Sequence, residues 1–222
     1  MSLFPDAIKR IHFFKRFFVF DPNDLKINQN ILPSTNFYFD YSQESAYEID
    51  SEKKAYFFGT YINYRMDTIF KLTEKLTEIG FEPDISIVAF SRDNIEKYKD
   101  SKIKFLNERI SFEENIKNAK QSDILIDIVN GKHKGLSFRT FDAIGYEKKL
   151  ITTNSEVRKY DFYHPNNFFI LEENNLGEIE DFLKKPFVKL DDSIKLKYSF
   201  TNWIHYMLDI QPYQVINLPN NI

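Results

Sequence analysis

The 222-residue sequence contains no cysteine, which excludes structural disulfides, cysteine-based metal sites and a cysteine nucleophile. No apolar segment approaches the length of a membrane span. The apolar run Phe13–Phe20 is interrupted by Lys15 and Arg16 and lacks a small-residue cleavage site. The sequence therefore predicts a cytoplasmic protein without a signal peptide. A peripheral association with the inner face of the membrane stays open, because the amino-terminal region is basic and aromatic.

A surplus of basic residues is also missing, since the formal net charge is −3. Nucleic-acid-binding proteins usually carry such a surplus, so we expect no nucleic-acid partner. The four histidines show none of the spacings with acidic residues that are typical of a metal site, and we expect no metal. With 42% apolar and 17% aromatic residues, the chain can form a packed core.

Strand and helix patterns alternate along the chain from Ala55 onward. Apolar residues recur at helical spacing before Gly80, which is placed to end that helix, and Ser111 with Glu114 forms a capping box. The predicted strands are Ala55–Phe58, Ile85–Phe90, Ile103–Leu106, Ile124–Ile128, Leu150–Thr153 and Phe168–Leu171. The predicted helices are Arg65–Ile79, Ser91–Tyr98, Ser111–Lys120, Leu136–Tyr146, Leu176–Lys184 and Ile194–Leu208. This alternation predicts an α/β fold, a Rossmann-like parallel sheet with helices on both faces.

The composition divides the chain into three parts. Residues 1–54 combine a basic aromatic stretch, a short strand at Val19–Phe20 and a polar stretch, and we expect an interdomain-like segment and linker. Residues 55–190 form the expected Rossmann-like domain, and residues 191–222 a carboxyl-terminal helix and tail.

The segment Asp123–Asn154 has the order strand, basic glycine-containing loop, helix, strand. Its loop joins a strand's carboxyl end to a helix's amino end, where unpaired N–H groups and the helix dipole favour an anion such as phosphate. Asp142, one turn into the helix, can accept hydrogen bonds from a ribose diol. In the simpler alternative, Ser137 caps the helix and Asp142 is a surface acid. The candidate binding residues are Lys132, Lys134, Gly135, Ser137, Arg139, Thr140 and Asp142.

A second candidate loop, Gly59–Arg65, follows the first strand of the predicted sheet. Gly59 permits close backbone approach, Thr60 can donate a hydrogen bond, and Arg65 can reach a diphosphate with two parallel hydrogen bonds. An ordinary βα turn with a solvated arginine stays open as the alternative.

Gly135–Asn154, GLSFRTFDAIGYEKKLITTN, resembles the nucleotide-sugar-binding segment of GT-B glycosyltransferases, especially the bacterial enzymes of lipopolysaccharide and capsule polysaccharide synthesis. FDPNDL, FFGTYINYR, ISFEENI, YDFYHPNNFFIL and YSFTNWI extend the resemblance in the expected order. The resemblance covers only the carboxyl-terminal, donor-binding part of such an enzyme. It implies that the acceptor domain and the catalytic base are not visible in this chain, so no catalytic residue is assigned.

The resemblance implies a nucleoside diphosphate sugar as donor substrate, no tightly bound cofactor, and a glycan or lipid-linked acceptor. Asp142 takes the place of the family's ribose-binding glutamate, while Ser137, Arg139 and Thr140 lie by the diphosphate. Lys134 stands where many retaining members carry the first acid of an E-x7-E pair, so the stereochemical outcome is not implied.

The competing hypothesis is a noncatalytic nucleotide-binding or assembly module with the same fold. It would dock a partner domain or a second copy of the chain through the aromatic amino-terminal segment, with Phe13, Phe14, Phe17 and Phe18 in the contact.

Overall fold

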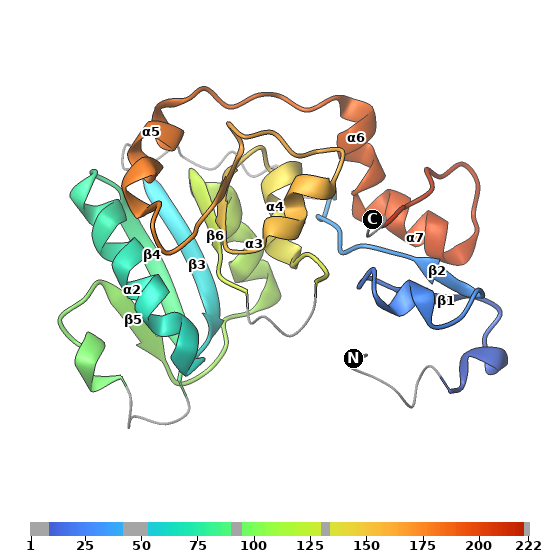
Figure 1. The fold of residues 1–222 in the computed structure, drawn as a ribbon, viewed down its shortest axis with the longest axis horizontal. Coiled ribbons are helices and arrows are strands. Elements are labelled where there is room, and N and C mark those ends of the chain that lie inside the picture. Colours follow the sequence, from blue (N-terminus) through green and yellow to red (C-terminus); the bar gives the residue numbers. More distant parts are fainter. Residues whose placement is uncertain (1–8, 42–52, 90–94, 130–133, 220–222) are drawn as a thin grey trace.

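Two parallel sheets organise the chain, one of six strands and one of two (Figure 1). The structure is a computed structural model and describes residues 9–41, 53–89, 95–129 and 134–219. The strands of these residues are β1 (Phe17–Val19), β2 (Ile31–Pro33), β3 (Lys54–Thr60), β4 (Glu82–Val88), β5 (Ile103–Leu106), β6 (Ile124–Asp127), β7 (Lys149–Thr152) and β8 (Phe168–Ile170). Their α-helices are α2 (Asn63–Glu78), α3 (Phe112–Gln121), α4 (Phe138–Gly145), α5 (Ile179–Lys184), α6 (Asp192–Lys197) and α7 (Phe200–Leu208).

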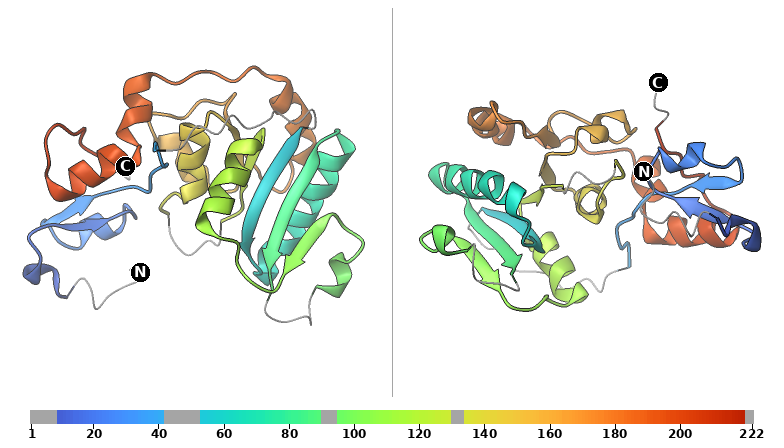
Figure 2. Two further views of the ribbon diagram at one scale, coloured as in Figure 1. Left: turned by 180° about the vertical axis from the view of Figure 1, so that it is seen from behind. Right: turned by 60° about the horizontal axis from the view of Figure 1, so that its bottom comes forward.

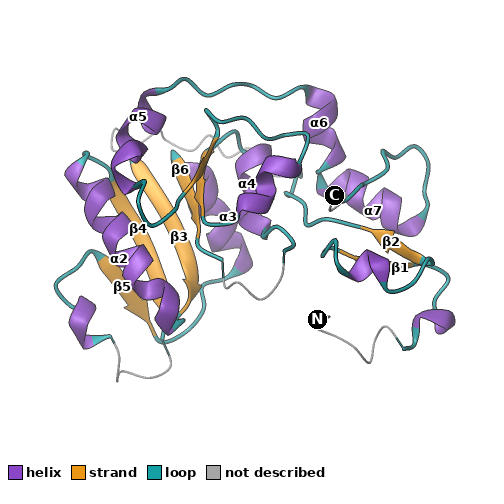
Figure 3. Ribbon diagram, in the orientation of Figure 1, coloured by secondary structure: helices purple, strands orange, loops and turns teal. Residues whose placement is uncertain are grey.

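The large sheet has the strand order β5-β4-β3-β6-β7-β8, and every neighbouring pair is parallel. Counted from β3 as the first strand, this is the 3-2-1-4-5-6 order of the doubly wound Rossmann fold. The predicted α/β fold is confirmed, and the strand–helix alternation is visible in Figure 3. The chain winds outward from β3 to β5 and then returns to β6, so the order reverses between β3 and β6.

Helices cover both faces of this sheet because alternate side chains of each strand point to opposite faces. Ala55 and Phe57 of β3 belong to a core with α2 and α5, whereas Tyr56 belongs to a second core with α3 and α4. Figures 1 and 2 show α2 on one side of the sheet and α3 and α4 on the other. All four residues of β6 are buried, as expected for a central parallel strand.

Local sequence signals set several element boundaries. Gly80 follows α2 with φ +84°, a conformation that favours glycine, and the strand Ile103–Leu106 matches its prediction. The hydroxyl of Ser111 accepts a hydrogen bond from the Glu114 N–H at 3.1 Å and caps α3. Within the predicted helix Ser91–Tyr98, the structure describes residues 95–98 and forms a 3₁₀ turn at Glu96–Tyr98.

The single terminal helix predicted at Ile194–Leu208 is wrong, because the structure contains two helices, α6 and α7. The chain leaves the helix at Tyr198 and is extended at Ser199, which pairs with Tyr38: the Tyr38 N–H donates to Tyr198 O and the Phe200 N–H to Tyr38 O. The Ser199 hydroxyl then caps α7 by accepting from the Asn202 N–H at 3.1 Å. Tyr38, which is 161 residues from its bridge partner Ser199, thus decides the break, and helical periodicity does not reveal it.

The amino- and carboxyl-terminal parts of the chain pack together beside α4 (Figure 1). The expected strand Val19–Phe20 lies slightly earlier, at β1, which pairs in parallel with β2. The Tyr206 hydroxyl of α7 donates to Pro33 O at 3.0 Å, and Trp203 Nε1 donates to Ser34 Oγ at 3.1 Å. Among the described residues, no helix is both long enough and apolar enough to cross a membrane.

Tyr38 docks this terminal part onto the last residue of α4. A Cβ atom added at Gly145 would lie 2.1 Å from Tyr38 Cγ and 2.7 Å from Tyr38 Cβ, so only glycine fits there without movement. The amino-terminal segment therefore contacts the helix backbone directly, next to the buried rings of the second core.

Replacing Gly145 by alanine is expected to lower the free energy of unfolding by about 1–3 kcal/mol, the usual cost of overpacking. Urea unfolding followed by circular dichroism measures the effect. Gly177→Ala is the matched control, because an added Cβ there meets nothing within 4 Å. In a Tyr38→Ala background the penalty should shrink, since the ring is gone. Equal stability of the Gly145→Ala and Gly177→Ala proteins would contradict the packing described here.

Candidate functional site

The strand reversal between β3 and β6 is the place where an open parallel sheet usually binds its ligand, outside the carboxyl ends of the strands. Helix α2 starts shortly after β3, and α4 follows β6, so the amino ends of both helices lie at this edge. The described parts of the two loops singled out in the sequence therefore lie at the same edge of the sheet.

A cavity of about 210 Å³ lies beside β3 and β6. Its lining residues come from β3 and β6, from α2 and α3, and from the start of α4. Four of the predicted binding residues, Arg65, Ser137, Arg139 and Asp142, line it. Its full lining is Phe57, Phe58, Arg65, Asn115, Ile126, Asp127, Ile128, Ser137, Phe138, Arg139 and Asp142.

Arg65 joins the two strands across the reversal. Its Nη1 donates to Ile128 O at 3.0 Å, and its Nη2 donates to Thr60 O. A Cβ at Gly59 would lie 2.8 Å from Nη2, so Gly59 leaves room for the guanidinium group. Burial lowers the pKa of Arg65. Gly59 thus leaves space for the Arg65 guanidinium group, and the main-chain carbonyl of Thr60 accepts a hydrogen bond from it.

Arg139 and Asp142 form a buried ion pair on α4, with Nη1 and Oδ2 3.2 Å apart and side chains only 10% and 8% exposed. Arg139 Nη2 also donates to Asn115 Oδ1 at 2.9 Å, and the Tyr56 hydroxyl donates to the same oxygen at 2.8 Å. The guanidinium carbon lies 4.8 Å from the centre of the Tyr56 ring. Asp142 is therefore not the surface acid of the simpler alternative.

Burial dominates the electrostatics of both acids in the cavity wall. It raises the pKa of Asp142 from 3.8 to about 6, although Arg139 and Lys120 act in the opposite direction. Burial also raises the pKa of Asp127, although Ser137, Arg139, Thr152 and Arg65 act in the opposite direction. Both carboxylates are harder to ionise here than in water because a low-dielectric environment disfavours the charged form.

Of the remaining predicted binding residues, those that the structure describes are not among the lining residues of the cavity. The Lys134 N–H donates to Asp21 Oδ2 at 3.0 Å, and Gly135 packs against Phe20, to which an added Cβ would approach within 2.3 Å. Thr140 is 1% exposed, and its hydroxyl has no hydrogen-bond partner in the part of the chain that the structure describes. Lys132 lies outside the described residues. The role of these positions in ligand binding stays a prediction.

Sequence reasoning missed Asp127, Asn115 and Phe138, which also line the cavity. Asp127 is the one carboxylate within the apolar run Ile124–Ile128, and a charged residue in a buried strand was an available signal. Asn115 carried no signal, because it sits on an ordinary amphipathic helix. Ser137 stands at the first position before α4, yet its hydroxyl forms no capping bond.

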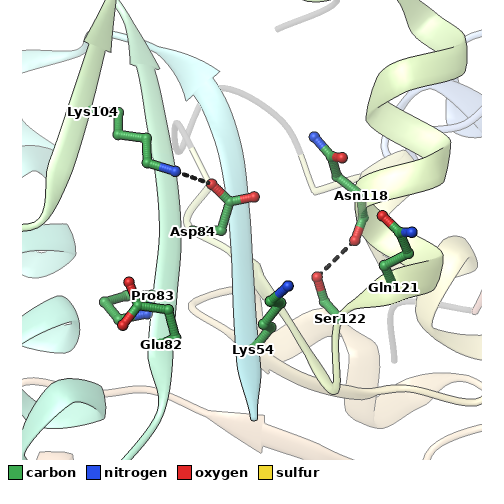
Figure 4. A pocket seen from close by; sticks show the side chains of 8 residues that line it. All are labelled: Lys54, Glu82, Pro83, Asp84, Lys104, Asn118, Gln121 and Ser122. Carbon is green, nitrogen blue, oxygen red and sulfur yellow. Dashed lines mark hydrogen bonds and ion pairs between the residues drawn. The ribbon is translucent and has the colours of Figure 1, made fainter. Parts of the chain in front are cut away.

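Two other cavities are less suited to a diphosphate. One of about 610 Å³ is lined by Asp67, Glu172 and Glu173 with Lys71 as its one lysine, so its charge opposes an anion. The other, shown in Figure 4, lies at the amino ends of β3 and β4, where Lys104 already pairs with Asp84 at 3.0 Å. It occupies the edge opposite to the one where parallel sheets bind ligands.

Within the described ranges, no group of three or more histidine and acidic side chains is placed to hold a metal ion. Comparison of the chain with protein-family models and with curated protein sequences gives no match. The fold and the cavity geometry are therefore the observations from which a function can be argued.

Proposed function

We propose that this chain binds a nucleoside diphosphate sugar at the strand reversal and acts as the donor-binding part of a GT-B-type glycosyltransferase. The observation that carries the proposal is the cavity between β3 and β6, where Arg65 of one predicted loop meets Ser137, Arg139 and Asp142 of the other. Doubly wound sheets bind nucleotides at this position. The resemblance of Gly135–Asn154 to a nucleotide-sugar-binding segment supplies the ligand class.

The amino end of α4 is the natural place for the diphosphate. The first N–H groups of a helix have no partner within the helix, and the helix dipole makes this end electropositive. Lys134 lies just before the helix and is exposed. The side chains of Arg65 and Arg139 form hydrogen bonds within the protein, so they would add positive charge to the site from the cavity wall. These groups would also stabilise a departing diphosphate during transfer.

The proposal is tested with purified protein and UDP-, GDP-, ADP- and CMP-sugars, first by thermal shift and then by calorimetry. We expect one of these donors to bind, and Lys134→Ala to weaken its binding about tenfold, the usual effect of losing a charge-assisted hydrogen bond. Lys104→Ala is the matched control at the opposite edge of the sheet and should bind within about twofold of wild type. The proposal fails if wild type binds none of the donors.

The alternative of a noncatalytic module is favoured by one observation. Phe13 and Phe14 are 75% and 57% exposed, which leaves aromatic surface for a partner next to β1. Phe18, by contrast, packs edge-on against Tyr206 at 5.4 Å between ring centres. Measuring donor hydrolysis beside donor affinity separates the two functions, because a noncatalytic module binds the donor and leaves it intact.

A further inference from the structure

The proposed diphosphate site gives no role to Asp127, a polar residue that lines the cavity. It ends β6 at the strand reversal, lines the cavity and is 8% exposed. Its side chain points to the face of α3 and α4, as does that of Leu125 two residues earlier. The carboxylate therefore faces the side of the sheet on which α4 begins.

The protein compensates this buried charge only in part, because burial outweighs the lowering of the Asp127 pKa by the neighbouring hydroxyls and arginines. Thr152 on the neighbouring strand donates to Asp127 Oδ2 at 3.3 Å, which is long for a hydroxyl hydrogen bond. Among the described residues, no cation lies within ion-pair distance of it: Arg139 pairs with Asp142, and Arg65 binds the carbonyls of Thr60 and Ile128. A buried carboxylate without an ion pair lowers stability, and such groups cluster at functional sites.

A second unsatisfied group lies beside it. Among the described residues, the buried Ser137 hydroxyl has no hydrogen bond of good geometry, and its hydrogen bond with the Asp127 carboxylate, which lowers the pKa of that acid, is therefore a distorted one. The cavity thus presents a carboxylate, which can only accept a hydrogen bond, next to a hydroxyl whose hydrogen bond to it is distorted and which can donate to a ligand instead. A ligand hydroxyl satisfies both, because it donates to Asp127 and accepts from Ser137. A phosphate oxygen can only accept and is repelled by the carboxylate.

We propose that Asp127 and Ser137 bind a sugar hydroxyl of the nucleotide sugar, so that the cavity holds an uncharged, polyhydroxylated ring while the diphosphate lies outside it at the start of α4. This inference rests on the proposed function and assigns one part of the ligand. The cavity size agrees with it. About 210 Å³ is below the roughly 300–1,000 Å³ of sites that enclose a whole drug-sized ligand, which agrees with one ring inside and the rest of the nucleotide sugar outside.

The ring can be the ribose or the transferred sugar, and the test separates them. Calorimetry measures the binding of UDP, GDP and ADP, of their 2′-deoxy analogues and of the matching diphosphate sugars to wild type and to Asp127→Asn. The substitution is nearly isosteric and removes a buried charge, so the melting temperature should stay equal or rise. We expect at least tenfold weaker binding of the diphosphate sugar, and a several-fold loss in Ser137→Ala. Asp84→Asn, at the opposite edge, is the control and should bind as wild type does.

If the ring is the ribose, Asp127→Asn weakens the binding of the plain diphosphate and makes the 2′-deoxy analogue bind as well as the ribonucleotide. If it is the transferred sugar, only the diphosphate sugar loses affinity. The inference is overturned, with the proposed function intact, when wild type binds a donor and Asp127→Asn binds every compound within twofold. Absence of donor binding in wild type overturns both.

Discussion

Replacing Arg139 by alanine is expected to lower the free energy of unfolding by about 3–5 kcal/mol at pH 8, the usual cost of removing one partner of a buried ion pair. The substitution leaves the Asp142 carboxylate, 8% exposed, without its guanidinium partner 3.2 Å away. It also removes a hydrogen bond to Asn115 and the guanidinium group over the Tyr56 ring. Urea unfolding gives the value directly.

The pH dependence of this loss identifies its cause. Arg139 holds the pKa of Asp142 down, so in Arg139→Ala that pKa rises beyond about 6. At pH 5 the folded state already holds Asp142 mostly protonated, with or without Arg139, and no unpaired carboxylate results. The penalty should therefore be clearly smaller at pH 5 than at pH 8. A penalty independent of pH would assign the effect to lost packing.

Two variants control for this result. Arg158→Ala removes an arginine whose side chain is 54% exposed and lies 4.0 Å from Glu172, and such a surface pair should change stability by less than about 1 kcal/mol. Arg139→Met combined with Asp142→Leu removes both charges and should recover most of the stability, because an apolar pair of similar volume often replaces a buried ion pair at no cost. Failure of the double variant to recover would contradict the ion-pair explanation.

The fold could be predicted because the sequence patterns that indicate it are local. Periodicity distinguishes the buried strands from the amphipathic helices, Gly80 and Ser111 mark helix ends, and parallel strands with helical crossovers permit few arrangements. The break between α6 and α7 could not be predicted, because it depends on main-chain pairing with Tyr38. Local patterns cannot specify a partner that only the tertiary structure brings close.

The candidate site was predictable in position and less so in detail. The rule that ligands bind at carboxyl strand ends places both loops at one edge, and the structure brings Arg65 and Arg139 to one cavity there. What each side chain contacts depends on neighbouring strands. Arg65 spans β3 and β6, and Gly135 accommodates Phe20 from the amino-terminal segment. Gly135, a candidate binding residue in the sequence, is thus a packing contact in the structure.

The polar residues around the cavity divide into two groups. Arg65, Arg139 and Asn115 bond to one another or to the main chain and hold the wall in place, although Arg65 Nε has no partner among the described residues. Asp127 and Ser137 are incompletely bonded, so they are the groups with most to gain from a ligand. Substitutions in the first group should act mainly on stability, and those in the second mainly on binding.

Asp142 is also expected to make the protein less stable as the pH rises from about 4 to about 6. Burial raises its pKa from 3.8 in the unfolded chain to about 6 in the folded state, so within this window the folded state binds the proton that the unfolded state has lost. The stabilisation is complete below the unfolded pKa and is lost as the pH passes through the folded pKa. At about 1.4 kcal/mol per pKa unit, the loss is about 3 kcal/mol.

Comparison with Asp142→Asn isolates this contribution, because asparagine resembles the protonated acid and does not titrate. Unfolding free energies of both proteins, measured by urea at half-unit steps between pH 4 and 8, should diverge in favour of the variant up to about pH 6 and then stay parallel. Asp127 shifts stability in the same direction but is present in both proteins, so it cancels in the difference. A difference that grows in favour of wild type with rising pH would mean that the Arg139 ion pair outweighs burial, and that the Asp142 pKa is lowered instead.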